Sequence, residues 1–253
     1  MMKNTTPFVL IMGLFREQRH WGDFPILLSK KFPDAKIICV DIPGSGKRYH
    51  EPSPTSIASM VDKIREGFGA KIHINIIAIS MGGMIGLQWA AMYPKEINSL
   101  TCLNTSARNF SKFYHRLQTK NYFTIFKALF LSVKKREKVI YKLLSNRPED
   151  KKVIEDWTLY TQQYPISKIN FLRQLWAAFK FTVDKKVTCR LLFISSVSDN
   201  LVDHKATKAI AYEWEAQLLI NLHDGHDIAL DNPQWLCDMI DRFVTRCITK
   251  QSR

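Results

Sequence analysis

A serine, an aspartate and a histidine each follow an apolar run of this 253-residue sequence, and side chains of these three types can together carry out nucleophilic acyl transfer. Ser80 stands between Asn75–Ile79 and a glycine-rich segment, and Asp199 and His226 follow later apolar runs. A serine hydroxyl is a weak nucleophile, so it needs an imidazole to take its proton and a carboxylate to orient that imidazole. We therefore predict that Ser80 is the nucleophile, that a histidine on the loop after Gln217–Leu222 is the base, and that an aspartate on the loop after Arg190–Ser195 orients it.

The residues around Ser80 predict a sharp turn between a strand and a helix. Asn75–Ile79 has the composition of a buried strand, and Met81–Tyr93 that of a helix, which places Ser80 on the turn between them. The pattern Gly-x-Ser-x-Gly is partly met, because Ala78 occupies the first glycine position and Gly82 the second. Taken alone, this turn could also be an ordinary connection that happens to contain a serine.

Six apolar runs separated by helical segments predict the elements that position these side chains. Near-continuous apolar strands alternating with helices indicate a parallel sheet covered on both faces. We therefore expect an α/β fold with a mostly parallel sheet of about six strands. The predicted strands are Phe8–Met12, Lys36–Val40, His73–Ile79, Ser99–Asn104, Arg190–Ser195 and Gln217–Leu222, and a final helix is predicted from Pro233 to about Ile248.

Residues 107–186 interrupt this alternation with aromatic and basic helical sequence. They contain 18 Lys and Arg against 6 Asp and Glu, so they carry +12 of the chain's net charge of +14. We predict a core made of residues 1–106 and 187–253, with residues 107–186 as a basic helical cap. Two interpretations of the cap stay open: its apolar face packs on the core with the lysines in solvent, or it is a positive lid that attracts anionic acyl carriers or acidic lipids. The apolar face would contain Phe123, Phe126, Leu129, Phe130 and Val133.

The order Ser, Asp, His along a strand and helix alternation resembles the α/β-hydrolase family, in its small serine carboxylesterase type. The resemblance covers about Pro7–Ser106 and Val187–Ile248, and it includes the Gly225-His226 pair. In this family two backbone N–H groups form the oxyanion hole, which implies Leu14 and Met81 here. Met12 stands where the family usually has histidine, but a backbone donor does not depend on that side chain.

The resemblance also decides between neighbouring candidates for the base and the acid. His223 lies close to His226, but a histidine directly after glycine is the family pattern and favours His226. Asp203 lies on the same loop as Asp199. Asp199 is closer to the strand end and matches the family's acid, whereas Asp203 could cap the next helix.

Ester hydrolysis is the activity that the resemblance implies, with a Ser80 acyl-enzyme and neither a metal nor an organic cofactor. The expected substrate is a small-molecule ester with a small to medium acyl group, although thioesters, lactones and lipids would use the same residues. The chain is also similar to the esterases that cleave pimeloyl-carrier methyl ester, which implies as an alternative that the basic cap docks an acidic acyl carrier protein. A non-catalytic binding protein or scaffold on this fold is a further alternative.

Composition and charge narrow the function further. No run of about 18 apolar residues occurs, which argues against a membrane span. Residues 1–4 lead directly into the first predicted strand and leave no room for a signal peptide, so we expect a cytoplasmic location. The cysteines form no Cys-x-x-Cys pair and no metal-ligand spacing, so we expect reduced thiols. The basic pI of about 9.6 would suit nucleic-acid binding, but the sequence contains no nucleic-acid-binding motif. We therefore do not expect nucleic acid as a partner. The five cysteines are Cys39, Cys102, Cys189, Cys237 and Cys247.

Four residues that follow the first predicted strand have no assigned role in the sequence. They could line the mouth of the pocket, or they could form an exposed helix start. They are Arg16, Arg19, His20 and Trp21. The segment Asp41–Arg48 superficially resembles a phosphate-binding loop, but it lacks the first glycine and ends in arginine, so a turn explains it.

Overall fold

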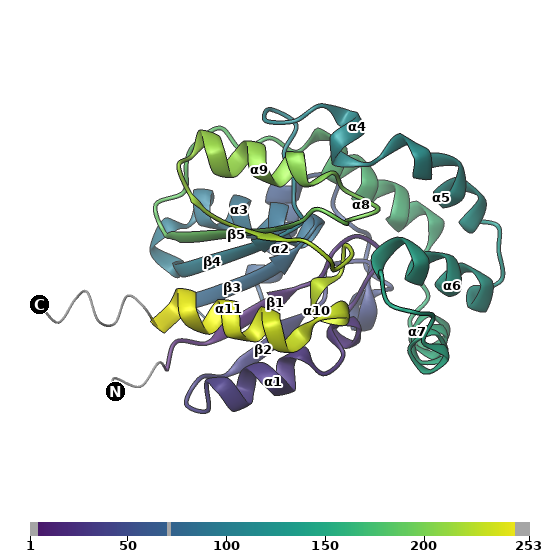
Figure 1. Cartoon of the computed structure of the whole chain (residues 1–253), viewed down its shortest axis with the longest axis horizontal. Helices are drawn as coiled ribbons and strands as arrows, with labels where there is room; N and C mark the ends of the chain where they lie inside the picture. The colour runs from purple at the N-terminus through teal and green to yellow at the C-terminus, as the bar shows by residue number, and fades with distance from the viewer. Residues whose placement is uncertain (1–4, 70–71, 246–253) are drawn as a thin grey trace, which may run out of the picture.

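The fold is built on a six-stranded parallel sheet, which the computed structural model describes for residues 5–69 and 72–245 (Figure 1). The strand order across the sheet is β2-β1-β3-β4-β5-β6, and every neighbouring pair is parallel. The strands are β1 (Phe8–Ile11), β2 (Ile37–Val40), β3 (Ile74–Ile79), β4 (Ile97–Leu103), β5 (Arg190–Ser196) and β6 (Gln217–Asn221). The predicted α/β class and the predicted strands are confirmed, with strand ends displaced by at most two residues.

The central strands are largely apolar because helices cover the sheet on both faces. All residues of β1 and β3 are buried, and successive side chains of β1 enter opposite cores. One core contains α2 (Ile57–Arg65), α3 (Met81–Met92) and α9 (His204–Glu213). The other core contains α1 (Phe24–Lys31) and α11 (Pro233–Thr245), which lie side by side below the sheet in Figure 1.

Short helices complete the connections between these elements. The four-residue helix α10 (Ile228–Asp231) precedes α11, whose predicted end at Ile248 lies outside the described residues. Single 3₁₀ turns occur at η1 (Gln18–Trp21), η2 (Gly46–Arg48), η3 (Pro94–Glu96) and η4 (Thr119–Asn121).

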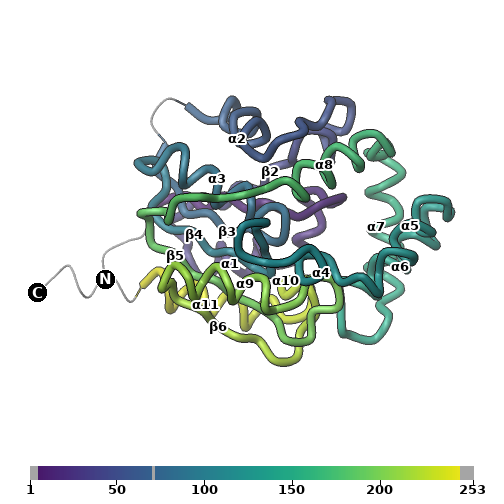
Figure 2. The backbone as a smooth tube through the Cα atoms, turned by 90° about the horizontal axis from the view of Figure 1, so that it is seen from above, coloured from purple at the N-terminus to yellow at the C-terminus, as the bar shows by residue number. Residues whose placement is uncertain are grey.

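The chain between β4 and β5 forms five α-helices beyond the carboxyl ends of the strands. They are α4 (Phe113–Arg116), α5 (Tyr122–Ala128), α6 (Val133–Leu144), α7 (Lys151–Gln163) and α8 (Lys168–Lys180). Helices α5, α6 and α7 lie together at one end of the molecule in both views (Figures 1 and 2). We call residues 107–186 the insertion. Its treatment as a separate cap domain stays a prediction.

The prediction that one apolar face of the insertion packs on the core is wrong in part. Phe123, Phe126 and Phe130 are exposed to solvent, whereas Leu129 lines an internal cavity. The prediction assumed one continuous helix through these residues. In the structure α5 ends at Ala128 and a tight turn follows, with N–H groups of residues 129–131 bonded three residues back.

The four cysteines within the described residues have free thiols, and Cys247 lies outside them. Cys102 and Cys237 are buried, whereas Cys39 and Cys189 are half-buried. Burial raises the pKa of the Cys39 and Cys189 thiols to about 11, so both stay protonated near neutral pH. In the part of the chain that the structure describes, no helix combines the length and the apolar character needed to cross a bilayer.

Candidate active site

Ser80 occupies a strained turn between β3 and α3. Its φ of 57° and ψ of −120° fall in a region that non-glycine residues rarely adopt. Two hydrogen bonds hold this conformation: Ser80 N donates to Leu103 O at 2.8 Å, and Thr105 Oγ1 donates to Ser80 O at 2.8 Å. The end of β4 and the residues that follow it therefore fix the serine in place.

Two glycines allow β1 and the turn that follows it to pack directly against the serine turn. A Cβ atom on Gly82 would lie 2.3 Å from Ile11 O, closer than any real contact. A Cβ atom on Gly13 would lie 3.0 Å from the Cβ of Ser80. These close approaches place the segment after β1, which includes Leu14, next to the start of α3.

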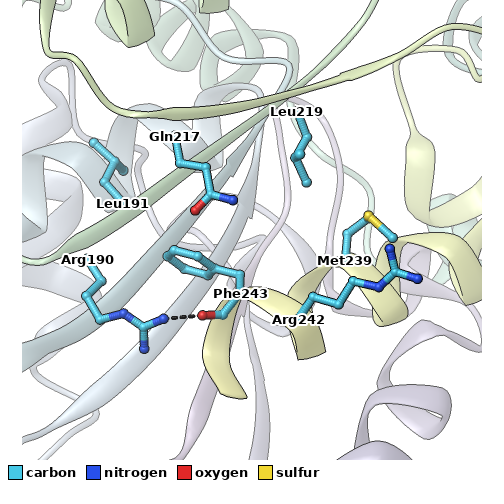
Figure 3. A pocket seen from close by; sticks show the side chains of 7 residues that line it. All are labelled: Arg190, Leu191, Gln217, Leu219, Met239, Arg242 and Phe243. Carbon is cyan, nitrogen blue, oxygen red and sulfur yellow. Dashed lines mark hydrogen bonds between the residues drawn. The ribbon is translucent and has the colours of Figure 1, made fainter. Parts of the chain in front are cut away.

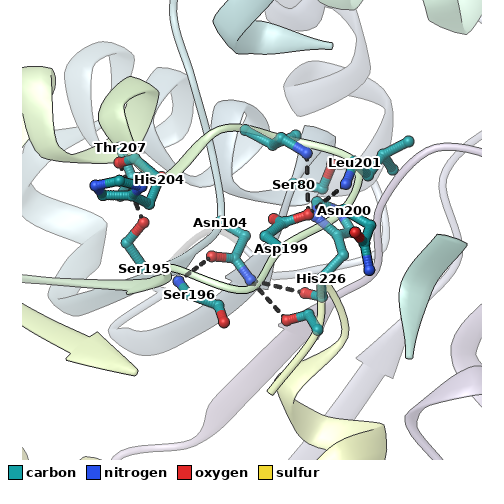
Figure 4. A network of polar contacts seen from close by, with 12 residues as sticks. Ser80, Asn104, Ser195, Ser196, Asp199, Asn200, Leu201, His204, Thr207 and His226 are labelled. Carbon is teal, nitrogen blue, oxygen red and sulfur yellow. Dashed lines mark hydrogen bonds and ion pairs between the residues drawn. The ribbon is translucent and has the colours of Figure 1, made fainter. Parts of the chain in front are cut away.

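Asp199 and His226 form a buried pair that connects the ends of β5 and β6 (Figure 4). The distance from His226 Nδ1 to Asp199 Oδ2 is 2.7 Å, and at most 4% of either side chain is exposed. Asp199 Oδ1 accepts hydrogen bonds from Leu201 N at 2.7 Å and Val202 N at 2.9 Å. Because the carboxylate accepts the Nδ1 proton, Nε2 of His226 is left free to exchange a proton.

The environment of His226 favours its protonated form. Burial lowers the pKa of the imidazole, but the charge and the hydrogen bond of Asp199 and the charge of Asp227 raise it by more. The net pKa of His226 therefore lies above its ordinary value. Asp227 lines the same cavity, and burial raises the pKa of its carboxyl to about 6.

Asn104, for which no role was predicted, connects three segments of the site (Figure 4). Its Nδ2 donates to His226 O at 2.8 Å, and its Oδ1 accepts from Ser196 N at 2.8 Å. Its backbone N donates to Ile194 O, and its φ is 46°. The available sequence signal was an asparagine directly after a buried strand, since asparagine tolerates positive φ better than most residues.

An apolar cavity brings Ser80, His226, Leu14 and Met81 together, because all four line it. Neither Leu14 nor Met81 uses its N–H in a hydrogen bond to any residue within 5–69 or 72–245. The rest of the wall comes largely from α5, α6 and α8 of the insertion, through Ile125, Ala128, Leu129, Ile140, Leu143, Leu144, Phe171 and Leu175. The serine therefore faces a largely apolar space.

The competing candidates lie elsewhere. His223 is exposed and is absent from the cavity wall. Asp203 accepts a 2.8 Å hydrogen bond from His115 and a 2.9 Å bond from Lys205 N, which caps α9. The structure therefore joins Asp199 to His226 and gives Asp203 a different partner.

Arg16 lines this cavity. The other three residues after β1 without a predicted role, Arg19, His20 and Trp21, do not. Arg16 Nη1 donates to Glu137 Oε2 and to His20 Nε2, both at 2.8 Å. Burial and the charge of Arg16 hold the pKa of His20 well below its usual value. Arg16 Nη2 and Arg136 Nε are buried, and among the described residues neither has a hydrogen-bond partner. Trp21 is buried, and Arg19 packs on the rings of Tyr160 and Tyr164.

The insertion is fastened to the loop that carries His226. The Asp231 carboxylate accepts hydrogen bonds from Ser145 Oγ and Asn146 N at the end of α6, and from Gly225 N on the histidine loop. Asp227 N also donates to Leu144 O at 2.9 Å. The end of α6 and the histidine loop are therefore joined through buried polar groups.

A second cavity, about 420 Å³ in volume, opens at the opposite end of the sheet, where the strands begin (Figure 3). It lies at the first residues of β5 and β6 and against α11, where Arg190 donates hydrogen bonds to Phe243 O and Val244 O. Its lining contains no carboxylate, histidine, serine or cysteine within the described residues. Among residues 5–69 and 72–245, no group of three or more His, Cys, Asp or Glu side chains could hold a metal ion.

One protein family matches the chain. The family described as alpha/beta hydrolase fold matches residues 6–132, which is half of the chain. None of the curated proteins matches the chain.

Solved structures of esterases are similar to this chain over nearly its whole length. A carboxylesterase from Nitrososphaera gargenis has 19% identity and a TM-score of 0.78, over 98% of this chain and 93% of that one. A Rhodococcus esterase has 16% identity and a TM-score of 0.72, over 95% and 90%. A thermophilic esterase from Thermogutta terrifontis has 16% identity and a TM-score of 0.72, over 96% and 90%. These identities indicate a shared fold. Together with the family match, the sheet order and the strained serine turn, they show that the chain belongs to the alpha/beta hydrolase fold family.

Proposed function

We propose that this protein is a serine hydrolase that cleaves carboxylic esters of small to medium acyl groups through a Ser80 acyl-enzyme. The observation that carries the proposal is the buried Asp199–His226 pair, whose imidazole lines the same cavity as the strained Ser80. A hydroxyl, a base and an orienting acid are the groups that this chemistry requires.

The reaction follows from these positions. His226 Nε2 takes the proton of the Ser80 hydroxyl while Oγ attacks the ester carbonyl carbon. The N–H groups of Leu14 and Met81 stabilise the negative charge on the former carbonyl oxygen, and each such donor contributes about 3 kcal/mol. His226 then returns the proton to the departing alcohol. Water activated by the same imidazole hydrolyses the acyl-enzyme and regenerates the serine.

The apolar wall supports an acyl chain as the part of the substrate that the cavity holds. Side chains from α5, α6 and α8 surround the space beside Ser80, so these helices set the length of chain that is accepted. Docking of an acidic acyl carrier protein, hydrolysis of a thioester and a cytoplasmic location stay predictions from the sequence.

A fluorophosphonate probe tests the proposal directly, because it labels only an activated serine. We expect the probe to label the wild type and not Ser80→Ala. Circular dichroism verifies that both proteins are folded. A panel of p-nitrophenyl esters of increasing chain length then defines the acyl preference. A folded wild type that neither reacts with the probe nor cleaves any ester would instead indicate a non-catalytic binding protein.

A further inference from the structure

Helix α5, with the turn that follows it, and helix α8 expose an unusual number of large apolar side chains. Phe123, Phe126 and Phe130 are between 61% and 75% exposed. On α8, four large side chains are between 51% and 67% exposed, namely Ile169, Leu172, Trp176 and Phe179. We call these seven side chains the aromatic face. Soluble proteins seldom expose such a cluster unless it contacts a partner or a membrane.

These two helices are apolar on both sides, which the cavity alone does not explain. Their inner sides already line the cavity, through Ile125 and Leu129 near α5 and through Phe171 and Leu175 on α8. A helix that serves only to cover a cavity would present polar residues to solvent on its other side. The outer side of each helix therefore needs a contact of its own.

The two halves of the aromatic face meet at Phe130 and Lys168. The Lys168 amine at the start of α8 lies 4.9 Å from the centre of the Phe130 ring. Trp176 stacks on Phe179, with ring centres 6.0 Å apart, and the Lys180 amine lies 5.1 Å from the centre of the Trp176 ring. Ammonium groups are thus interleaved with the aromatic rings.

The charge around this face selects an anionic partner. Residues 107–136 and 157–183, which contain α5 and α8, include no Asp or Glu and eleven Lys and Arg residues, of which Arg116 and Arg136 line the cavity. Two copies of such a surface would repel each other, so a second copy of this chain does not fit it. An occupant must offer negative charge at its surface and an apolar interior that accepts protruding phenylalanine and tryptophan side chains.

We propose that the aromatic face docks on a lipid bilayer that contains anionic phospholipids. Aromatic side chains flanked by lysines are the composition that inserts at the boundary between headgroups and acyl chains, and the lysines add attraction to anionic headgroups. An acidic protein would satisfy the charge, but seven large apolar side chains this far exposed match a bilayer better. This docking goes beyond ester hydrolysis and does not depend on turnover.

Cosedimentation with vesicles tests the docking in the Ser80→Ala protein, which separates binding from catalysis. We expect binding to vesicles of phosphatidylcholine with phosphatidylglycerol and little binding to phosphatidylcholine alone. The double variant Phe123→Ser/Trp176→Ser removes one ring from each half of the face, and we expect it to bind about tenfold more weakly or less. The reversal Lys168→Glu/Lys180→Glu should weaken binding to the anionic vesicles in the same way.

Matched controls lie on α9. Tyr212 is 81% exposed and Lys208 is also exposed, so Tyr212→Ser and Lys208→Glu make similar changes outside the face and should leave binding unchanged. Circular dichroism verifies the fold of every variant. The proposal is overturned if the wild type does not bind anionic vesicles. It is also overturned if the variants of the aromatic face bind them as strongly as the wild type. Binding of an acidic carrier protein that is lost in these variants, without vesicle binding, overturns it in favour of a protein partner.

Discussion

Asn104 donates a 2.8 Å hydrogen bond to the main-chain oxygen of His226, so a residue at the end of β4 holds the loop that carries the candidate base. The same side chain accepts a hydrogen bond from Ser196 N at the end of β5. One amide therefore fixes the distance between the segment that leads to Asp199 and the segment that carries His226. We assign Asn104 as a positioning residue on this ground.

Asn104→Asp should lower kcat/KM by about tenfold to a hundredfold, because the carboxylate still accepts from Ser196 N but cannot donate to His226 O. Misplacement of His226 should also change the pH profile, which a purely structural loss would not do. Asn109 supplies the control, because it makes a similar pair of bonds with Val183 outside the site, and Asn109→Asp should leave kcat/KM unchanged. Equal losses in both variants would remove the positioning role.

Asp199→Asn should lower kcat by about four orders of magnitude, since the amide cannot stabilise the imidazolium or fix its tautomer. Asp203→Asn is the matched control on the same loop. It keeps an oxygen that can cap α9, and it should retain activity to within a few-fold. Steady-state kinetics on a p-nitrophenyl ester compare the two variants. If Asp203→Asn were the more damaging change, the acid would be misassigned.

The rate of hydrolysis should rise with pH through a midpoint above 6.5. A protonated imidazole cannot accept the Ser80 proton, and the neighbouring carboxylates raise the pKa of His226 above its ordinary value. Activity is therefore low below that pKa and full above it. The pH dependence of kcat/KM reports the midpoint in the free enzyme.

Asp227→Asn should move that midpoint to lower pH, because the Asp227 charge is one of the causes that raise the pKa of His226. Asp224→Asn offers a comparison with a buried carboxylate that bonds to Asn221 and does not line the cavity. An unmoved midpoint in Asp227→Asn would show that its charge does not reach the base.

Glu137→Leu should lower the free energy of unfolding by about 3–5 kcal/mol. Glu137 is fully buried, and its loss leaves the buried Arg16 guanidinium without the carboxylate that lies 2.8 Å from it. The exposed pair of Lys134 and Glu155, 3.5 Å apart, provides the control, and Glu155→Gln should cost at most about 1 kcal/mol. Urea denaturation measures both. Similar losses in the two variants would mean that the buried pair contributes little.

Much of the fold was predictable because the strands are short, apolar and flanked by turns. Burial on both faces leaves β1 entirely apolar and β3 with Asn75 as its one polar residue, and such runs are visible in a sequence. Ser80, Asp199 and His226 were predictable as candidates because each follows a strand, and parallel strands end at one edge of a sheet.

The missed features depend on contacts between distant parts of the chain. Asn104 forms hydrogen bonds with Ser196 and His226, which lie 92 and 122 positions later in the chain. No local sequence pattern predicts contacts between residues so far apart. The orientation of Phe123, Phe126 and Phe130 depends on where α5 ends. Spacing alone could not place that end, because Leu129 and Leu131 after Ala128 are also good helix formers.

The bonds from Asp231 to the end of α6 and to Gly225 limit how the cavity can open. Because these bonds join α6 to the loop that carries His226, an outward movement of α6 would carry His226 away from Ser80. In the proposed reaction, substrate and products are therefore expected to pass on the side of the cavity formed by α5 and α8, where none of these bonds is made.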